Sequence, residues 1–154
     1  MCESVVKWIG RSPARFAQLV AYVDGDDRLL MQRAAYPLSF AIEKNPAFVT
    51  PHYHTLIRRM KEPGLHDAIR RNILRAFEYV DVPALWQGEL MDACFQFISN
   101  PREKPAVKAS CITVLGRLAK QHPDIVPEIK LVIEEMRDNE TAAFRARARK
   151  VFGL

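Results

Sequence analysis

Cysteine and glycine are scarce in this sequence, and long hydrophobic runs are missing. The three cysteines, Cys2, Cys94 and Cys111, are an odd number without CxxC spacing, which argues against a disulfide framework and a thiolate zinc site. The six glycines are scattered, so no Gly-rich phosphate loop or Gly-x-Ser-x-Gly nucleophile turn occurs. No apolar run approaches the ~18 residues of a membrane-spanning helix, and no secretion signal is recognised. We therefore expect a cytoplasmic protein with reduced cysteines, no membrane span, no metal and no cofactor.

The length and charge set the next bounds. A chain of 154 residues is one domain long, and it buries enough of its surface, roughly 70%, to fold without disulfides or a metal. Lysines and arginines number 23 against 18 aspartates and glutamates, which gives a formal net charge of +5. This balance permits an acidic partner without requiring one.

The sequence repeats one helical pattern four times, and no segment alternates apolar and polar residues for long enough to predict a strand. In each copy, apolar residues stand at the first, fifth and ninth positions, which share one face of an α-helix. The copies lie at residues 30–38, 69–77, 107–115 and 144–152, so their first residues are 39, 38 and 37 positions apart. A period of this length is typical of proteins built from repeated helix pairs.

Another helix is predicted before each copy, at residues 13–23, 47–61, 84–99 and 124–137. We call these the first helices of the pairs, and the helices that carry the repeated pattern the second helices. Short segments rich in Asp, Asn, Gly and Pro separate the two helices of each pair, as is typical of turns and helix caps. The sequence thus predicts an all-α protein. We expect one domain over 1–154, with an N-terminal cap at 1–12 in which Trp8 is a capping residue, and repeats at approximately 13–44, 46–80, 84–121 and 124–153.

Three of the second helices open with an apolar residue followed by a cation, at Ile69-Arg70, Val107-Lys108 and Phe144-Arg145. Pro51 and Pro127 stand near the start of first helices, where a missing N–H is tolerated. In these features the chain resembles HEAT repeats, and it is similar to a group of small bacterial HEAT-repeat proteins of the ARM/HEAT-like α-solenoid class. The resemblance implies a right-handed α-α superhelix of about four HEAT-like helix pairs, with the second helices on the concave side. It also implies a structural role for Arg70, Lys108 and Arg145, as cations that bridge to turn residues of adjacent repeats.

Positions three, six and ten residues after each starting apolar residue are predicted to face away from the core. These positions, which we call the second-helix column, are mostly polar, basic and aromatic: Arg33, Tyr36, Phe40, Asn72, Arg75, Tyr79, Ser110, Thr113, Arg117, Arg147 and Lys150. Interleaved arginine and tyrosine is favoured at binding surfaces for proteins and for nucleic acids alike. The column is therefore the candidate binding surface. The alternative, which carries equal weight for any single residue, is that its cations are ordinary solvated helix residues.

Catalytic and metal sites are only weakly indicated. If residues 52–54 are helical, His52 and His54 project about 200° apart and do not readily share one ion. Carboxylates gathered at 134–140 are typical of helix ends and solvated surfaces. We assign no general acid or base and predict that the chain is not an enzyme.

Two functions remain. The favoured one is a non-catalytic adaptor or scaffold, monomeric, whose second-helix column binds an unknown protein through an acidic or helical segment. The alternative is a nucleic-acid-binding protein, because the chain resembles alkylpurine DNA glycosylases in helix architecture. A basic cluster suited to phosphate contacts supports the alternative and consists of Arg58, Arg59, Lys61, Arg70, Arg71 and Arg75.

Base-extruding enzymes need a carboxylate and aromatic residues around the extruded base. Here the two tryptophans, Trp8 and Trp86, lie outside the second-helix column, and the column contains no acidic residue. This composition argues against glycosylase catalysis but not against simple nucleic-acid binding.

Overall fold

The computed structural model describes residues 2–154, and within this range all the regular elements are helices. The chain forms two compact units, one ending at Val80 and the other beginning at Asp81, which we call the N-unit and the C-unit. The expectation of an all-α fold is thereby confirmed. Along residues 2–154, no helix combines the length and apolarity needed to cross a bilayer.

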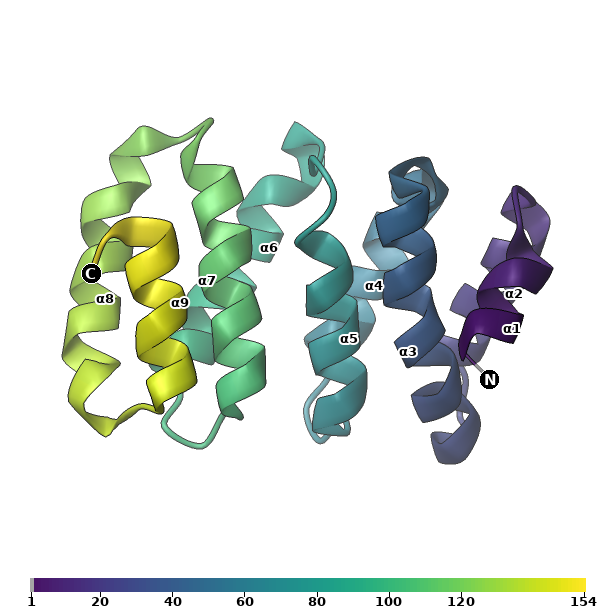
Figure 1. Cartoon of the computed structure of the whole chain (residues 1–154), viewed down its shortest axis with the longest axis horizontal. Coiled ribbons are helices and arrows are strands. Elements are labelled where there is room, and N and C mark those ends of the chain that lie inside the picture. Colours follow the sequence, from purple (N-terminus) through teal and green to yellow (C-terminus); the bar gives the residue numbers. More distant parts are fainter. Residues whose placement is uncertain (1) are drawn as a thin grey trace. The chain divides into compact units, whose positions relative to one another are not determined.

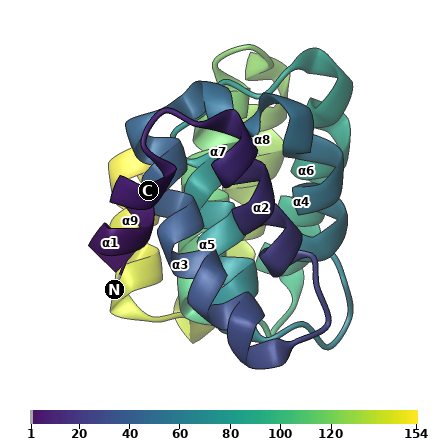
Figure 2. The same cartoon turned by 90° about the vertical axis from the view of Figure 1, so that its right-hand side faces the viewer.

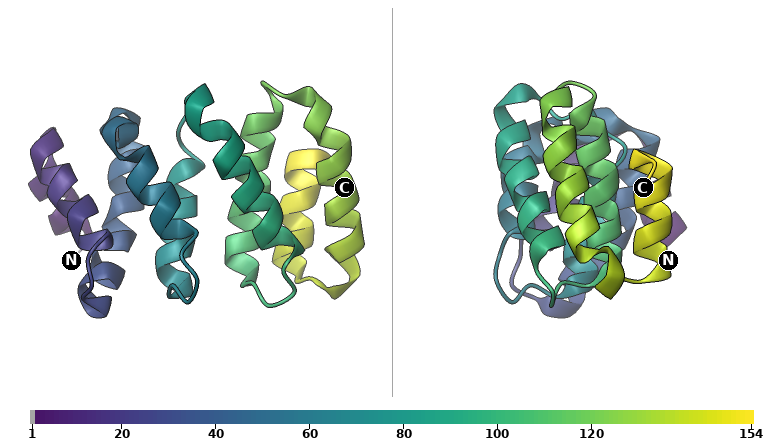
Figure 3. Two further views of the ribbon diagram at one scale, coloured as in Figure 1. Left: turned by 180° about the vertical axis from the view of Figure 1, so that it is seen from behind. Right: turned by 90° about the vertical axis from the view of Figure 1, so that its left-hand side faces the viewer.

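The N-unit consists of two helical layers (Figures 1 and 2). Its elements are α1 (Cys2–Ile9), α2 (Pro13–Val23), α3 (Arg28–Lys44), the 3-10 helix η1 (Pro46–His52), α4 (Tyr53–Met60) and α5 (Asp67–Phe77). Helix α3 packs against both α1 and α5, so these three form the second-helix layer. Helix α2 and the η1–α4 segment form the first-helix layer, which faces the viewer in the left panel of Figure 3.

Short polar side chains fix where the N-unit helices begin. Ser12 Oγ accepts a hydrogen bond from the Arg15 N–H at 3.2 Å, and Pro13 occupies the first turn of α2, where its missing donor costs nothing. Asp27 caps α3 in the same way, because its carboxylate accepts from the Leu30 N–H at 3.1 Å. The Ser12 cap and Pro13 account for the agreement between the predicted and observed start of α2.

The segment predicted as one helix over 47–61 is instead divided. Residues Pro46–His52 form η1, and the α-helix proper begins only at Tyr53. Pro51 lies inside η1, and its ring and missing N–H disfavour continuous α-helical hydrogen bonding at that place. The prediction of a single helix was therefore wrong at its N-terminal half.

Arg59 joins the two helix pairs of the N-unit. Although its side chain is charged, it is buried, and its guanidinium donates to the carbonyl oxygens of Val23, at 3.1 Å, and Gly25. It also pairs with the Glu62 carboxylate at 2.5 Å. Because Val23 is the last residue of α2, Arg59 satisfies carbonyl groups that the helix end leaves without a partner.

The C-unit repeats the arrangement with α6 (Ala84–Ser99), α7 (Pro105–Ala119), η2 (Pro123–Ile125), α8 (Val126–Met136), η3 (Arg137–Asn139) and α9 (Ala142–Phe152). Helices α6 and α8 pack against each other as first helices, and α7 packs against α9 in the second-helix layer (Figure 3). At Gly116 the two helices are in close contact, because an added Cβ would clash with Val151 Cγ1. A glycine is required here by space rather than by backbone conformation.

The repeated apolar positions form the cores of both units. Ile73 and Phe77 are buried in the N-unit, and Cys111, Leu115 and Phe144 are buried in the C-unit. Burial of a large apolar side chain of this kind stabilises the folded state by roughly 1.5–3 kcal/mol. The nine-residue pattern therefore predicted the core correctly at these positions.

The structural cations implied by the family resemblance contact turns, although in different ways. Lys108, at 1% exposure, forms an ion pair with Glu140, which belongs to the turn of the following helix pair. Arg145 donates to the Glu140 carbonyl at 2.6 Å. Arg70 donates to the carbonyl oxygens of Met60, at 2.9 Å, and Glu62, at 2.8 Å, within its own pair.

Candidate functional site

Four members of the second-helix column form one cluster in the N-unit. The rings of Tyr36 and Phe40, one turn apart on α3, meet edge to face with centroids 5.0 Å apart. From the neighbouring helix, the Arg75 guanidinium lies over the Phe40 ring at 4.2 Å and near the Tyr79 ring at 5.7 Å. We call Tyr36, Phe40, Arg75 and Tyr79 the aromatic–arginine cluster.

Arg75 is held in place by α3 as well as by the rings. Its Nη1 donates to Ser39 Oγ at 2.8 Å, and its Nη2 lies 3.6 Å from a Glu43 carboxylate oxygen. These contacts fix the cation over the aromatic face, an arrangement that is stabilised by the ring quadrupole. The cluster is therefore preorganised, while Tyr36 remains 50% exposed.

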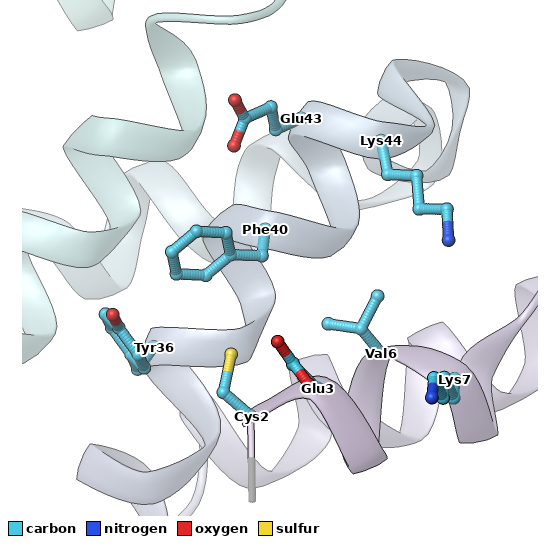
Figure 4. Close-up of a pocket in the computed structure, with 8 residues that line it drawn as sticks. All are labelled: Cys2, Glu3, Val6, Lys7, Tyr36, Phe40, Glu43 and Lys44. Carbon is cyan, nitrogen blue, oxygen red and sulfur yellow. The ribbon is translucent and has the colours of Figure 1, made fainter.

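A pocket of about 720 Å³ adjoins the cluster between α1 and α3 (Figure 4). Helix α1 contributes Cys2, Glu3, Val6 and Lys7, and helix α3 contributes Tyr36, Phe40, Glu43 and Lys44. Val6 and Phe40 give the pocket an apolar middle, and charged side chains surround it. Its volume falls within the range of small-ligand and side-chain binding pockets, roughly 300–1,000 Å³.

Cys2 is the accessible thiol of the chain, because Cys94 and Cys111 are buried. Partial burial raises the pKa of the Cys2 thiol above its ordinary value, which disfavours the reactive thiolate. Across residues 2–154, His, Cys, Asp and Glu side chains do not gather in groups of three that could hold a metal ion. The chemistry available in the pocket is thus apolar and ionic contact.

Comparison with known proteins identifies the architecture. A model of the HEAT repeat domain matches residues 1–153, which is nearly the whole chain. The chain belongs to the HEAT repeat family. No curated protein and no solved structure shows significant similarity to it. HEAT repeats are protein-interaction and scaffold modules and are generally non-catalytic.

In the C-unit, most polar side chains of the second-helix column contact other parts of the same unit. Arg147 on α9 donates to Thr113 Oγ1 at 2.6 Å and to the Ala109 carbonyl at 3.2 Å, both on α7. Arg117 pairs with Asp81 at 2.6 Å. Lys150 is exposed. Most of these polar side chains therefore connect segments of the C-unit.

Two column residues do not face outward as expected. Asn72 is only 4% exposed, and its amide donates to the Ala68 carbonyl at 2.8 Å, one turn back along α5. Ser110 is also buried. Both positions are covered in the folded chain, so the prediction that they are accessible was wrong. Arg33 lies as expected, exposed on α3 one turn before Tyr36.

The basic cluster that suggested phosphate binding is partly neutralised within the N-unit. Arg58 pairs with Asp24 at 2.5 Å, and Arg59 is the buried residue that binds the end of α2. Arg70 donates hydrogen bonds to backbone carbonyl oxygens, and Arg75 packs over the Phe40 ring. Lys61 and Arg71 are exposed. Fewer cations are thus presented to solvent than the sequence suggested.

The sequence did not indicate half of the pocket. Its α1 side lies outside the repeat pattern, so periodicity gave no reason to place Val6 or Lys7 beside α3. Glu43 and Lys44 follow Phe40 by three and four residues, which is one further turn of the same helix face. Extending the column by that turn would have found these two residues.

Proposed function

We propose that this HEAT repeat protein is a protein-binding adaptor whose contact site is the second-helix face of the N-unit. The aromatic–arginine cluster carries the proposal. Tyrosine and arginine are enriched among the residues that contribute most to protein–protein affinity, and such residues cluster in well-packed parts of an interface. Rigidity matters because side chains that are already ordered lose less entropy on binding.

The distribution of charge supports a partner with acidic character. Residues 1–80 contain 12 lysines and arginines against eight aspartates and glutamates, whereas residues 81–154 contain 11 against ten. The N-unit therefore holds most of the excess positive charge. Complementary charge of this kind accelerates association and selects among partners.

Affinity purification from cells at low and at high salt tests the adaptor function. The variant is Tyr36→Asp, and its matched control is Leu131→Asp, which places the same charge on α8 at an apolar side chain that is 56% exposed against 50% for Tyr36. We expect the same protein to be recovered with wild type and the control and to be lost with Tyr36→Asp, with nuclease treatment having no effect. Equal recovery with both variants would contradict the proposed site.

Nucleic-acid binding is the second candidate, favoured by the exposed cations Lys61, directly after α4, and Arg71, on α5. In that case nuclease or high salt would remove the bound material, because phosphate contacts release counterions. The double variant Lys61→Glu, Arg71→Glu would then reduce binding while Tyr36→Asp would not.

A further inference from the structure

The pocket between α1 and α3 has two chemically different ends (Figure 4). Cys2 and Tyr36 lie at one end, and the aliphatic side chain of Val6 faces the Phe40 ring in the middle. Lys7 and Lys44 lie on the side of the pocket away from Cys2 and Tyr36, one on each helix. A ligand that fills this pocket therefore contacts apolar side chains in the middle and two ammonium groups on one side.

The positive end extends beyond the pocket itself. A second hollow of about 230 Å³ shares Val6 and Lys44 with the first and adds Arg11 and Phe48 to the walls. No carboxylate belongs to the described lining of this second hollow. Together the two hollows are lined by the cations Lys7, Arg11 and Lys44, and the two carboxylates, Glu3 and Glu43, belong to the first pocket alone.

The carboxylates of the first pocket do not cancel this charge evenly. Glu43 lies 3.6 Å from Arg75, so its charge is directed toward the aromatic–arginine cluster. Glu3 stands one turn before Lys7 on α1, nearer the Cys2 end. An anionic group is consequently favoured at the lysine end and disfavoured at the Cys2 end, which gives the pocket a direction.

We propose that this pocket accepts a short segment of the partner protein in which an aromatic or long aliphatic side chain is followed closely by a carboxylate. The apolar side chain lies against Val6 and Phe40, and the carboxylate is bound by Lys7 and Lys44. This inference rests on the proposed adaptor function and specifies the part of the partner that is recognised.

Selection from a displayed library of random short peptides tests the preference without knowledge of the natural partner. Wild type should enrich peptides with an aspartate or glutamate next to a large apolar residue. The charge-swapped variant Lys7→Glu, Lys44→Glu should bind these peptides about tenfold more weakly. Selection with this variant should instead enrich peptides with lysine or arginine at the same position. The matched control Lys104→Glu, Lys120→Glu changes two exposed lysines of the C-unit and should retain the wild-type preference.

The thiol of Cys2 gives an independent reading of pocket occupancy. Because the other two cysteines are buried, maleimide labelling of the native protein reports on Cys2. A selected peptide should slow this labelling severalfold at saturating concentration, and an otherwise identical peptide with alanine in place of the apolar residue should not.

The outcomes separate this inference from the proposed function. If selected peptides have no acidic preference, or leave Cys2 labelling unchanged, the pocket preference is overturned, while loss of the cellular partner in Tyr36→Asp would still support the adaptor. If no peptide is enriched, the inference also fails. If the charge swap changes the selected residue from acidic to basic, the pocket preference and the proposed adaptor function are both supported.

Discussion

The ion pair between Lys108 and Glu140 gives the strongest prediction for stability. Both side chains are almost fully buried, at 1% and 8% exposure, and they connect α7 to the turn before α9. Removing one partner of such a pair leaves a charge in a poorly solvated place, which typically costs about 3–5 kcal/mol. We expect Glu140→Gln to lie at the lower end, about 3 kcal/mol, because the amide oxygen can still accept a hydrogen bond from Lys108.

Urea unfolding followed by tryptophan fluorescence measures this loss. The chain has two tryptophans, Trp8 in the N-unit and Trp86 in the C-unit, so a Trp8→Phe background reports on the C-unit alone. With a urea dependence of about 2 kcal/mol per M, a loss of about 3 kcal/mol lowers the midpoint by about 1.5 M. The control Glu134→Gln, at an exposed position of α8, should change stability by less than ~0.5 kcal/mol.

A double variant distinguishes the pair from its separate side chains. Lys108→Met, Glu140→Gln removes both charges, and we expect it to be at least about 2 kcal/mol more stable than the sum of the single changes predicts. Additive effects, or a loss below about 1 kcal/mol for Glu140→Gln, would refute the reasoning that a buried charge pair joins these helices.

Three further changes test other contacts. Arg59→Met should destabilise the N-unit by about 2–4 kcal/mol in urea unfolding, because it leaves the carbonyl oxygens at the end of α2 without their donor. Gly116→Ala should cost about 1–3 kcal/mol by overpacking, and Val151→Ala in the same chain should restore most of the loss. Burial lowers the pKa of His52 from its ordinary value, so His52 binds a proton more readily in the unfolded chain than in the folded one. Stability of the N-unit should therefore fall as pH drops through about 6.5 and level off below the folded pKa, whereas His52→Gln should show no such step.

Much of the fold follows from local signals in the sequence. The caps at Ser12 and Asp27 and the apolar period place α2 and the buried faces of the second helices correctly. The failure at 47–61 is also local in origin, because Pro51 was read as a tolerated helix-start residue when it marks the end of a 3-10 segment. Apolar periodicity indicates which face is buried, but it does not determine the type of helix.

The candidate site was predictable only in part, because exposure depends on neighbouring elements. Spacing along the two predicted second helices placed Tyr36, Phe40, Arg75 and Tyr79 away from the core, and these four do meet, although Tyr79 lies just beyond the end of α5. The same spacing gave no warning that Asn72 is covered by packing and bonded to its own helix. The position of α1 beside α3 follows from tertiary packing outside the repeat period, so the pocket could not be found from the column alone.

Photo-crosslinking in cells from position 36 tests the central claim most directly. Replacing Tyr36 with p-benzoylphenylalanine keeps an aromatic side chain at the cluster, and the same replacement at Leu131 serves as the reference on α8. We predict a discrete protein adduct from position 36 that is absent from position 131 and insensitive to nuclease. Adducts that are the same from both positions, or that disappear on nuclease treatment, would contradict the assignment of the N-unit face as a protein-binding site.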